Sequence, residues 1–172
     1  LGVMGTLTVD NLNVNSNITG GKINAPAFMA VLSTDTDVTN NARTKVQFDT
    51  EIFDSGGQYD NTTNFRFTPT TAGKYYCFGN AQYYGVGQSN AQWLFVEMFK
   101  NGTSGAKYSG YVDFRANPGD GGGAYAGGIF DMNGSSDYVE FYIYPSLTSG
   151  TPTMSGDNTS RTTFFGAFRL GV

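Results

Sequence analysis

Short runs of alternating apolar and polar residues, rather than helical periodicity, dominate the chain. Tyr, Phe, Val and Thr fill these runs, and Gly, Asn, Asp and Ser separate them. In one run, Val139, Phe141 and Ile143 alternate with Glu140, Tyr142 and Tyr144, so one face of a strand is apolar. This pattern is typical of an all-β sandwich or barrel. It predicts strands at residues 27–33, 44–50, 64–68, 74–84, 91–100, 106–114, 124–131, 137–144 and 162–170.

The connections support this pattern of strands. Asn101-Gly102 and Asn133-Gly134 are strong signals for tight turns. The run WLFVEMF at 93–99 is apolar on both faces except at Glu97, which predicts a central strand that is covered on both sides. We expect the longest loop near 145–160. No internal repeat is evident, which argues against a propeller or a solenoid.

The N-terminal residues have a different pattern from the rest. Residues 6–18 (TLTVDNLNVNSNI) predict two very short strands, each with one apolar edge. Such strands need other chains or the main domain to cover that edge. Gly20, Gly21 and Pro26 then mark a linker. We therefore predict an N-terminal stalk or linker segment at 1–26 and a head domain at 27–172.

Composition and charge exclude several classes of function. The 172 residues include no His and one Cys, so no Ser-His-Asp triad, Cys-His pair or His-ligated metal site is available. With a net charge of -4, the chain has no basic stripe for nucleic acid. No apolar run approaches the ~20 residues of a membrane span, so we expect no membrane insertion. A glycosidase would need two acids in one cleft. The chain has three glutamates, Glu51, Glu97 and Glu140, and we expect Glu97 to be a hydrogen-bonded strand residue. We therefore expect no enzymatic activity.

Loop aspartates are the candidate metal ligands. Asp35, Asp37, Asp120 and Asp157 could offer oxygen atoms to calcium. Their spacing matches no calcium-binding loop, and isolated loop aspartates are usually solvated. We therefore predict no cofactor, with calcium as the alternative and no ligands assigned.

The stretch 46–78 resembles the globular head domain of complement component 1q, a family that shares the jelly-roll fold of the tumour necrosis factor superfamily. The residues that carry the match are Phe48, Asp54, Tyr59, Phe67, Gly73 and Tyr75. Phe67 comes one residue late, which indicates an insertion in the preceding loop. Cys77 and Gly79 stand where the family has aromatic residues, and these departures affect local register rather than the fold.

Three later segments agree with this resemblance, which covers about 28–172. VEMFKNGT (96–103) is similar to a strand that leads into an Asn-Gly turn, and GGIFDMNGSSDYVEFYI (127–143) is similar to a strand, turn and strand. TTFFGAFRL (162–170) is similar to the closing strand. A two-sheet jelly roll would place its largest apolar side chains between the sheets. We expect this core to contain Phe48, Phe67, Tyr75, Phe141 and Phe168, with Gly73 forming the turn before the strand 74–84.

The number of aromatic rings predicts a homotrimer. The chain has 14 Phe, 11 Tyr and one Trp, and several lie on both faces of one strand. Both faces can be apolar only if something covers the outer one. In the resembled families, two identical subunits around a threefold axis supply that cover. YAGGIF (125–130) resembles the strand that places a Tyr near the axis, and Phe164 resembles another axial aromatic residue. We predict Tyr125, Phe164 and Phe28 as axial contacts, the alternative being that they are ordinary core residues.

These observations favour a non-enzymatic virion protein, the C-terminal head of a bacteriophage tail fibre or spike. GTLTVDNLNVNSNIT (5–19) resembles linking segments in such proteins. The expected partners are two further copies of the chain, a glycan or protein receptor on the host surface, and other virion proteins through the N-terminal segment. One alternative is a purely structural head that trimerises a fibre or decorates a capsid. The other is a secreted complement 1q-like ligand or lectin-like module of a cellular organism, although the chain contains no Gly-X-Y collagen repeat.

Overall fold

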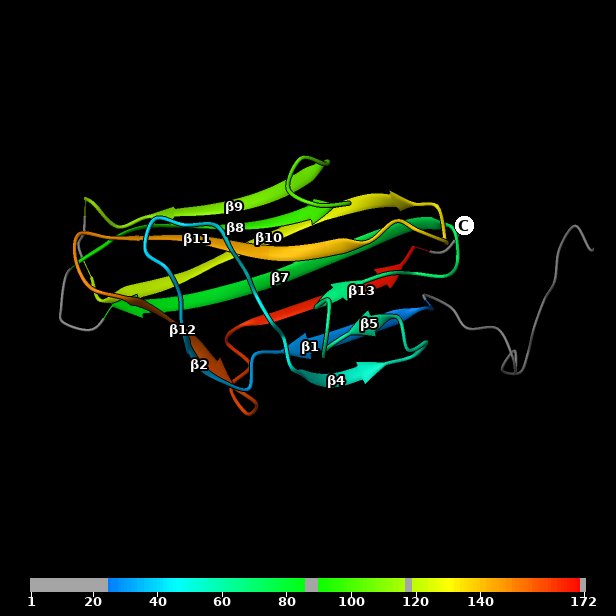
Figure 1. Ribbon diagram of the computed structural model, residues 1–172, viewed down its shortest axis with the longest axis horizontal. Coiled ribbons are helices and arrows are strands. Elements are labelled where there is room, and N and C mark those ends of the chain that lie inside the picture. The colour runs from blue at the N-terminus through cyan, green and yellow to red at the C-terminus, as the bar shows by residue number, and fades with distance from the viewer. Residues whose placement is uncertain (1–24, 86–89, 117–118, 171–172) are drawn as a thin grey trace, which may run out of the picture.

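The computed structural model describes residues 25–85, 90–116 and 119–170. These residues form two antiparallel sheets that lie face to face along the long axis of the molecule (Figure 1). None of them forms a helix long and apolar enough to cross a membrane. The prediction of an all-β, two-sheet sandwich is confirmed. Apart from Ala25 and Pro26, the predicted stalk lies outside the described residues.

The first sheet, sheet A, is built around the longest strand, β7 (Gly73–Gly85). One edge of β7 pairs along its whole length with β10 (Gly121–Met132). Its other edge pairs with β13 and then with β12. The remaining strands extend the sheet from these two partners. Their bounds are β13 (Phe164–Arg169), β12 (Pro152–Asp157), β1 (Ala27–Val31), β4 (Thr50–Asp54) and β2 (Thr34–Asp37).

The second sheet, sheet B, has β8 (Ala91–Lys100) at its centre. Its neighbours are β11 (Val139–Leu147) and β9 (Lys107–Asp113). Three strands of two residues each complete the sheet beyond β11. They are β3 (Thr44–Lys45), β5 (Tyr59–Asp60) and β6 (Arg66–Phe67).

The core between the sheets is aromatic at one end. The ring of Phe28 stacks on those of Tyr59 and Phe67, with centroids 4.7 and 4.8 Å apart. Phe165 meets Phe28 edge-on at 5.1 Å. All of these rings are buried, and such packed aromatic pairs stabilise a core beyond the area that they bury.

The loop after β4 explains why the resembled motif has an acidic residue there. The carboxylate of Asp54 accepts hydrogen bonds from the backbone N–H groups of Gly56, Gln58 and Tyr59, at 3.0, 2.6 and 2.7 Å. A single side chain thus satisfies three backbone donors of a tight loop. This loop directs Tyr59 into the core, where its hydroxyl donates to the carbonyl of Phe48.

The segment predicted as one strand at 44–50 is divided in the structure. β3 pairs with β11 in sheet B, whereas β4 pairs with β1 in sheet A. Residues 46–49 between them cross from one sheet to the other and belong to no strand, although the N–H of Val46 still donates to the carbonyl of Phe141 at 2.9 Å. Val46 and Phe48 remain fully buried during this crossing. Their alternation therefore reflects burial between the sheets rather than continuous strand pairing.

Three strands, β2, β5 and β12, were not predicted from the sequence. β2 and β12 lie at one edge of sheet A, and β12 occupies part of the predicted loop at 145–160. β2 consists of TDTD, and all four residues are exposed. A polar edge strand lacks the alternation by which a half-buried strand is recognised.

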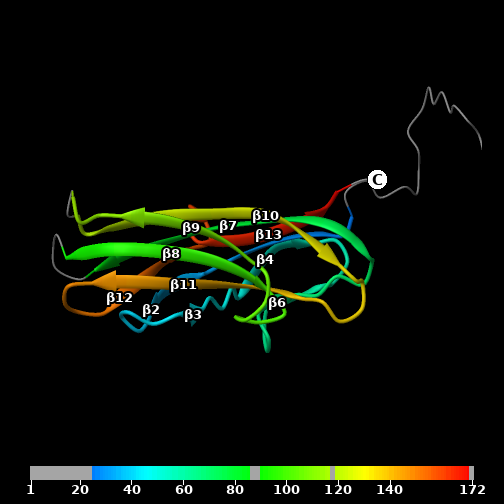
Figure 2. The same cartoon turned by 90° about the horizontal axis from the view of Figure 1, so that it is seen from above.

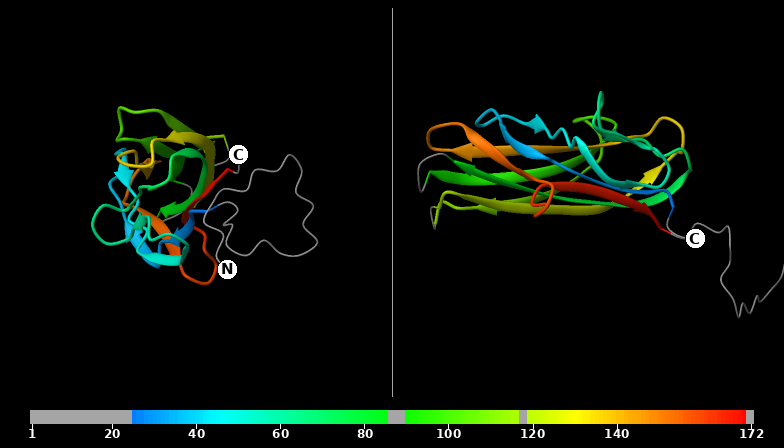
Figure 3. Two further views of the ribbon diagram at one scale, coloured as in Figure 1. Left: turned by 90° about the vertical axis from the view of Figure 1, so that its right-hand side faces the viewer. Right: turned by 90° about the horizontal axis from the view of Figure 1, so that it is seen from below.

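The described chain begins and ends at the same end of the sandwich. Ala27 at the start of β1 pairs with Phe168 near the end of β13, as the two adjacent ends in Figure 3 show. The turn between β11 and β12 lies at the opposite end of the long axis (Figure 2). The start of β1 therefore lies at the end remote from this turn.

Candidate oligomerisation face

The outer side of sheet A carries a continuous set of apolar side chains. Five strands lie side by side there, in the order β10, β7, β13, β1 and β4. Successive residues of a strand point to opposite faces, so the residues that alternate with the core form the outer face. We call the following set the apolar face: Ala27, Met29, Phe53, Tyr76, Phe78, Tyr125, Ile129, Phe164 and Phe168.

These side chains form rows across the strands. In the first row, both Ile129 and Phe168 are paired with Tyr76. In a later row, Tyr125 and Phe164 lie on either side of Asn80. Directly opposed residues have Cβ atoms about 4.5–5.5 Å apart, so each row is a set of contacting neighbours.

The row between these two is centred on Phe78. Gly127 and Gly166 flank Phe78 in the ladder, and Met29 and Phe53 continue the row. A Cβ added to Gly166 would lie 2.8 Å from the Phe78 ring. The absence of a side chain at Gly166 therefore provides the space that the Phe78 ring occupies.

Four rings make up the centre of the apolar face. Phe78 lies 5.9 Å from Tyr76, 6.2 Å from Phe168 and 6.3 Å from Phe164, measured between ring centroids. Tyr76 and Phe168 are 5.7 Å apart. The rings thus pack against one another on the surface of the subunit, although none of them is fully buried there.

The two borders of this cluster are more exposed. Tyr125, Ile129 and Phe53 have 49, 47 and 50% of their surface accessible. The hydroxyl groups of Tyr125 and Tyr76 lie 3.0 Å apart and share a hydrogen bond. Partial burial and this hydrogen bond raise the pKa of Tyr125 to about 12. The phenol is therefore neutral at physiological pH, and its ring can be covered without burying a charge.

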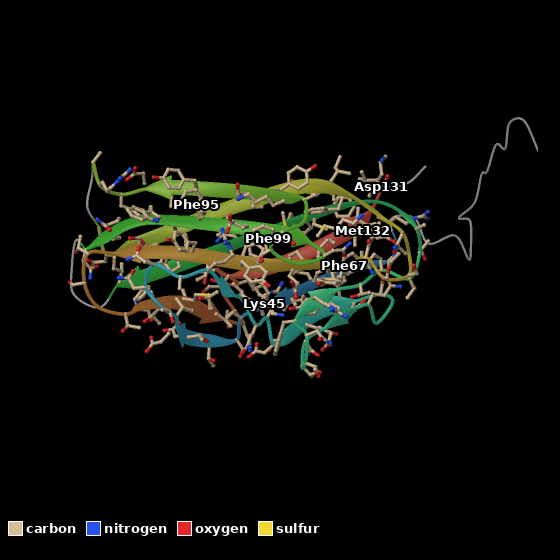
Figure 4. All side chains as sticks on the ribbon, turned by 45° about the horizontal axis from the view of Figure 1, so that its top comes forward. Lys45, Phe67, Phe95, Phe99, Asp131 and Met132 are labelled. Atoms are coloured by element: carbon tan, nitrogen blue, oxygen red, sulfur yellow. The ribbon has the colours of Figure 1, made fainter. Side chains whose placement is uncertain are left out.

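Polar groups limit the apolar face at both ends of the strands. Lys74 and Asp131 pair at 3.3 Å beyond Tyr76, at the end of β10 that Figure 4 marks with Asp131. At the other end, Nδ2 of Asn80 donates to the carbonyl of Thr162 at 2.6 Å. An apolar centre with a polar rim is the arrangement found in protein–protein interfaces.

The outer side of sheet B is also rich in aromatic residues, and cations lie over two of them, Phe99 and Trp93, whereas Phe95 packs against Tyr111 and Tyr144. Phe95 and Phe99 lie on this side of β8 (Figure 4). The Arg43 guanidinium is 5.4 Å from the centroid of Phe99, and the Lys107 amine is 5.7 Å from it. Arg115 covers Trp93 in the same way at 5.4 Å. These cations place charged groups at the surface above the two rings, which is compatible with exposure to solvent.

Glu97 anchors this charged cover. Its side chain is 3% exposed and lies between Arg43, at 2.6 Å, and Lys107, at 2.9 Å. Burial alone would raise the pKa of Glu97, but the hydrogen bonds from Arg43 and Lys107 outweigh that effect and lower it. The structure thus places Glu97 as a hydrogen-bonded strand residue, as the sequence predicts.

The structure corrects the prediction for Phe28. This residue was predicted to contact the threefold axis, yet it has no exposed surface and stacks within the core. Its neighbour Met29 lies on the outer face instead. Because side chains alternate along β1, only one of the two can point outward.

The structure also corrects the prediction for Phe168. This residue was predicted in the core, but it lies on the apolar face against Tyr76 and Phe78. Phe165, which was not assigned to the core, is buried there. Phe164 and Phe168 are four residues apart in one strand and therefore share a face.

The other predicted residues lie as follows. Phe48, Phe67, Tyr75 and Phe141 are fully buried between the sheets. Gly73 begins β7 with a φ of 146°, a conformation that a side chain disfavours. Tyr125 and Phe164 both lie on the apolar face.

Sequence reasoning missed Tyr76, Phe78 and Ile129 as members of the apolar face. The signal was available within β7, where Tyr76 and Phe78 alternate with the buried residues Tyr75 and Cys77. It was obscured because both faces of this strand are apolar, so alternation alone does not say which side is the core.

The aspartates considered for calcium do not form a metal site in the described part of the chain, where no three acidic or thiol side chains gather to hold an ion. The carboxylate of Asp35 instead accepts hydrogen bonds from the Tyr84 hydroxyl and the Gly156 backbone N–H. These bonds, that of Tyr84 foremost, lower the pKa of Asp35.

Comparison with known proteins finds similarity in structure but not in sequence. No family model matches the chain, and no curated protein matches it. The globular domain of zebrafish complement 1qA superimposes with a TM-score of 0.57 and 14% identity, over 85% of this chain and 97% of that one.

Two ligands of the tumour necrosis factor type give similar results. Murine APRIL at pH 5.0 has a TM-score of 0.59 and 14% identity, over 84% of this chain and 98% of that one. Eiger TNF from S. frugiperda has a TM-score of 0.55 and 11% identity, over 84% and 92%. At these identities the likeness establishes the fold, and the chain is therefore a jelly-roll sandwich of the complement 1q and tumour necrosis factor type.

Proposed function

We propose that the chain is a non-enzymatic binding head that works as a homotrimer, with the apolar face as part of the subunit interface. The observation that carries the proposal is the row of rings across β10, β7 and β13 that no cation covers among the described residues. Monomeric proteins rarely leave a contiguous apolar patch of this kind in water. A second copy of the chain would remove it from solvent.

A threefold arrangement is favoured over a twofold one by two residues. The sequence resemblance implies that Tyr125 and Phe164 approach a threefold axis. In the structure they come from different strands and meet the same residue, Asn80, from its two sides. A closed ring of three uses a heterologous interface, in which two different patches of each subunit meet. The apolar face is one of these patches.

The trimer would serve adhesion. Three identical weak sites on one rigid head bind a surface jointly far better than one does. The start of β1 lies at one end of the head, and the β11–β12 turn lies at the other. We place the receptor-binding loops at this second end, and the stalk with other virion proteins at the first. In this proposal the head belongs to a bacteriophage tail fibre or spike.

Mass in solution tests the trimer. Light scattering on the purified chain at micromolar concentration should return about three times the subunit mass of 18.5 kDa. The variant Tyr125→Asp places a charge on the exposed border of the apolar face and should return the mass of one subunit with an unchanged circular dichroism spectrum. Tyr144→Asp is the matched control, because this ring lies on the outer side of sheet B, and it should remain trimeric. A wild-type mass of one subunit, or a trimeric Tyr125→Asp, would overturn the interface.

Adhesion is tested separately. The fluorescently labelled trimer is applied to a panel of bacterial strains and to immobilised glycans, beside the monomeric Tyr125→Asp variant. We expect the trimer to be retained by at least one surface and the monomer to wash off. If the trimer binds no surface, and if an unrelated trimeric domain replaces the head without loss of attachment, the head is structural rather than adhesive.

A further inference from the structure

A cavity of about 320 Å³ opens between the two sheets at the side where β2 and β3 lie. β2 belongs to sheet A and β3 to sheet B, so the cavity enters the open edge of the sandwich. None of its lining residues belongs to the apolar face. Its volume lies at the lower end of the range of small-molecule sites.

The cavity has a buried apolar wall beside the polar lining residues Thr36, Thr44 and Gln47. Leu32, Val38 and Met154 line it, and each has less than a tenth of its surface exposed. Phe65 contributes a partly exposed ring from the loop before β6. The backbone φ of Phe65 is 48°, a conformation that residues other than glycine seldom adopt. The fold thus keeps an aromatic ring at the cavity although the local conformation is unfavourable.

The rim of the cavity carries two carboxylates. Asp49 accepts hydrogen bonds from the backbone N–H and the hydroxyl of Ser33, at 3.0 and 2.6 Å. Asp37 accepts one from the Thr153 hydroxyl at 2.6 Å. In the parts of the chain that are described, neither carboxylate pairs with a cation. Each keeps acceptor capacity for a further donor.

Lys45 is the cation that lines the cavity, and its charge is already matched. Its amine lies 2.9 Å from Glu140 and 2.9 Å from the carbonyl of Asn64. Glu140 itself does not line the cavity. The cavity with its rim is therefore net anionic, and an anion that entered it would meet Asp37 and Asp49.

We propose that this cavity binds a primary ammonium group carried on a short alkyl stem. The stem would lie against Leu32, Val38 and Met154, and the ammonium group would donate to Asp37 and Asp49. Phe65 adds an aromatic wall of the kind that attracts ammonium groups. The buried apolar wall disfavours a bare metal ion, which would need oxygen ligands on several sides. This site does not depend on the trimer.

An NMR titration of the whole chain tests the proposal. Pentylammonium chloride is the probe, and 1-pentanol and sodium pentanoate are its neutral and anionic counterparts. The methyl signals of Leu32 and Met154 report on the interior of the cavity. We expect pentylammonium to shift them saturably with a dissociation constant of about 1 mM, as befits a ligand of six heavy atoms. Equal binding of pentanol, or no saturable shift with pentylammonium, would overturn the proposal.

Matched variants test whether the carboxylates of Asp37 and Asp49 bind the ammonium group. Asp49→Asn and Asp37→Asn should each weaken pentylammonium binding about tenfold, since each removes one charge-assisted hydrogen bond. Asp131→Asn removes an exposed carboxylate of β10 that does not line the cavity and should leave binding unchanged. If all three variants bind like the wild type, the carboxylates at the rim do not form the site. The spectra themselves show that each variant is folded.

The same titration identifies the source of the ammonium group. Nα-acetyl-lysine N-methylamide carries the same amine on a peptide backbone. If it shifts the same methyl signals, the cavity accepts a lysine side chain of a partner protein. If pentylammonium alone does so, a free alkylamine is the ligand. Either result supports the ammonium site, and failure of both probes would exclude it.

Discussion

The outer sides of the two sheets carry similar aromatic rings in different surroundings. Tyr76, Phe78 and Phe168 on sheet A contact one another and small residues. Phe99 and Trp93 on sheet B lie beneath guanidinium and ammonium groups. All four cation–π contacts found within the described residues lie on the sheet B side.

This difference shows that aromatic content alone does not identify an interface. A cation above a ring must lose water before another apolar surface can cover it, and this desolvation opposes such coverage. On sheet B, Glu97 fixes Arg43 and Lys107 in that position through two short ion pairs. On sheet A, the ion pair of Lys74 with Asp131 stands at the rim and covers no ring. The composition predicts that some face must be covered, and in our proposal the placement of the cations indicates which one.

The largest effect expected from this comparison concerns the two misassigned phenylalanines. Phe28→Ala should reduce the free energy of unfolding by about 3–5 kcal/mol, because it empties the middle of a packed ring cluster. Phe168→Ala should cost only about 1 kcal/mol, because its ring is partly exposed on the apolar face. Urea unfolding followed by Trp93 fluorescence measures both values in the Tyr125→Asp background, which we expect to be monomeric.

In the wild-type background, which we expect to be trimeric, Phe168→Ala should have the larger effect on assembly. Phe168→Ala should then weaken assembly on dilution, whereas any folded Phe28→Ala should assemble normally. Equal destabilisation of the monomer by the two substitutions would mean that Phe168 is a core residue after all. The comparison between the two sides of β13 would then lose its basis.

The sequence predicted the long strands well because their alternation is strong. β8 was expected at 91–100 and is found at Ala91–Lys100. The central motif was also informative, since Phe48, Asp54 and Tyr59 act together around one tight loop. These features depend on residues that are close in the chain, and local patterns describe such residues best.

The face of the sheet on which each side chain lies was predicted less well. Phe164 was assigned to the interface and Phe168 to the core, although a period of two puts both on one side. This inconsistency could have been detected from the sequence. The covering of Phe99 could not, because Arg43 reaches Glu97 across 54 positions of the chain and only the fold brings them together.

A smaller effect is expected when the charged cover of sheet B is weakened. Glu97→Gln removes the buried acceptor of two charge-assisted hydrogen bonds and should cost about 1–3 kcal/mol of unfolding free energy. Arg43 and Lys107 are partly exposed and can regain water, which limits the loss. Asp131→Asn breaks the exposed pair on sheet A and should change stability by less than about 0.5 kcal/mol. If Glu97→Gln and Asp131→Asn lower the thermal stability equally, the buried ion pairs of Glu97 stabilise the fold no more than the exposed pair of Asp131.

Lowering the pH should reduce the difference in unfolding free energy between the wild type and Glu97→Gln. The pKa of Glu97 is lower in the folded state than its ordinary value, so its contribution is present above the unfolded pKa. That contribution is lost as the pH falls through the folded pKa. Urea unfolding from pH 7 down to pH 2 should therefore show the two curves converging below about pH 4. A gap that stays constant over this range would mean that the charge of Glu97 does not stabilise the fold.

The smallest effect separates the ring of Tyr125 from its hydroxyl. Tyr125→Phe removes the hydrogen bond to Tyr76, which is exposed and should contribute less than about 1 kcal/mol. The ring remains on the apolar face, so light scattering should still return a trimer, in contrast to Tyr125→Asp. Tyr76→Phe removes the same bond from the other side and is the matched control. Dissociation of both phenylalanine variants would assign the assembly to the tyrosine hydroxyl pair rather than to burial of the rings, and the contrast between the two sheets would then rest on hydrogen bonding instead of uncovered apolar surface.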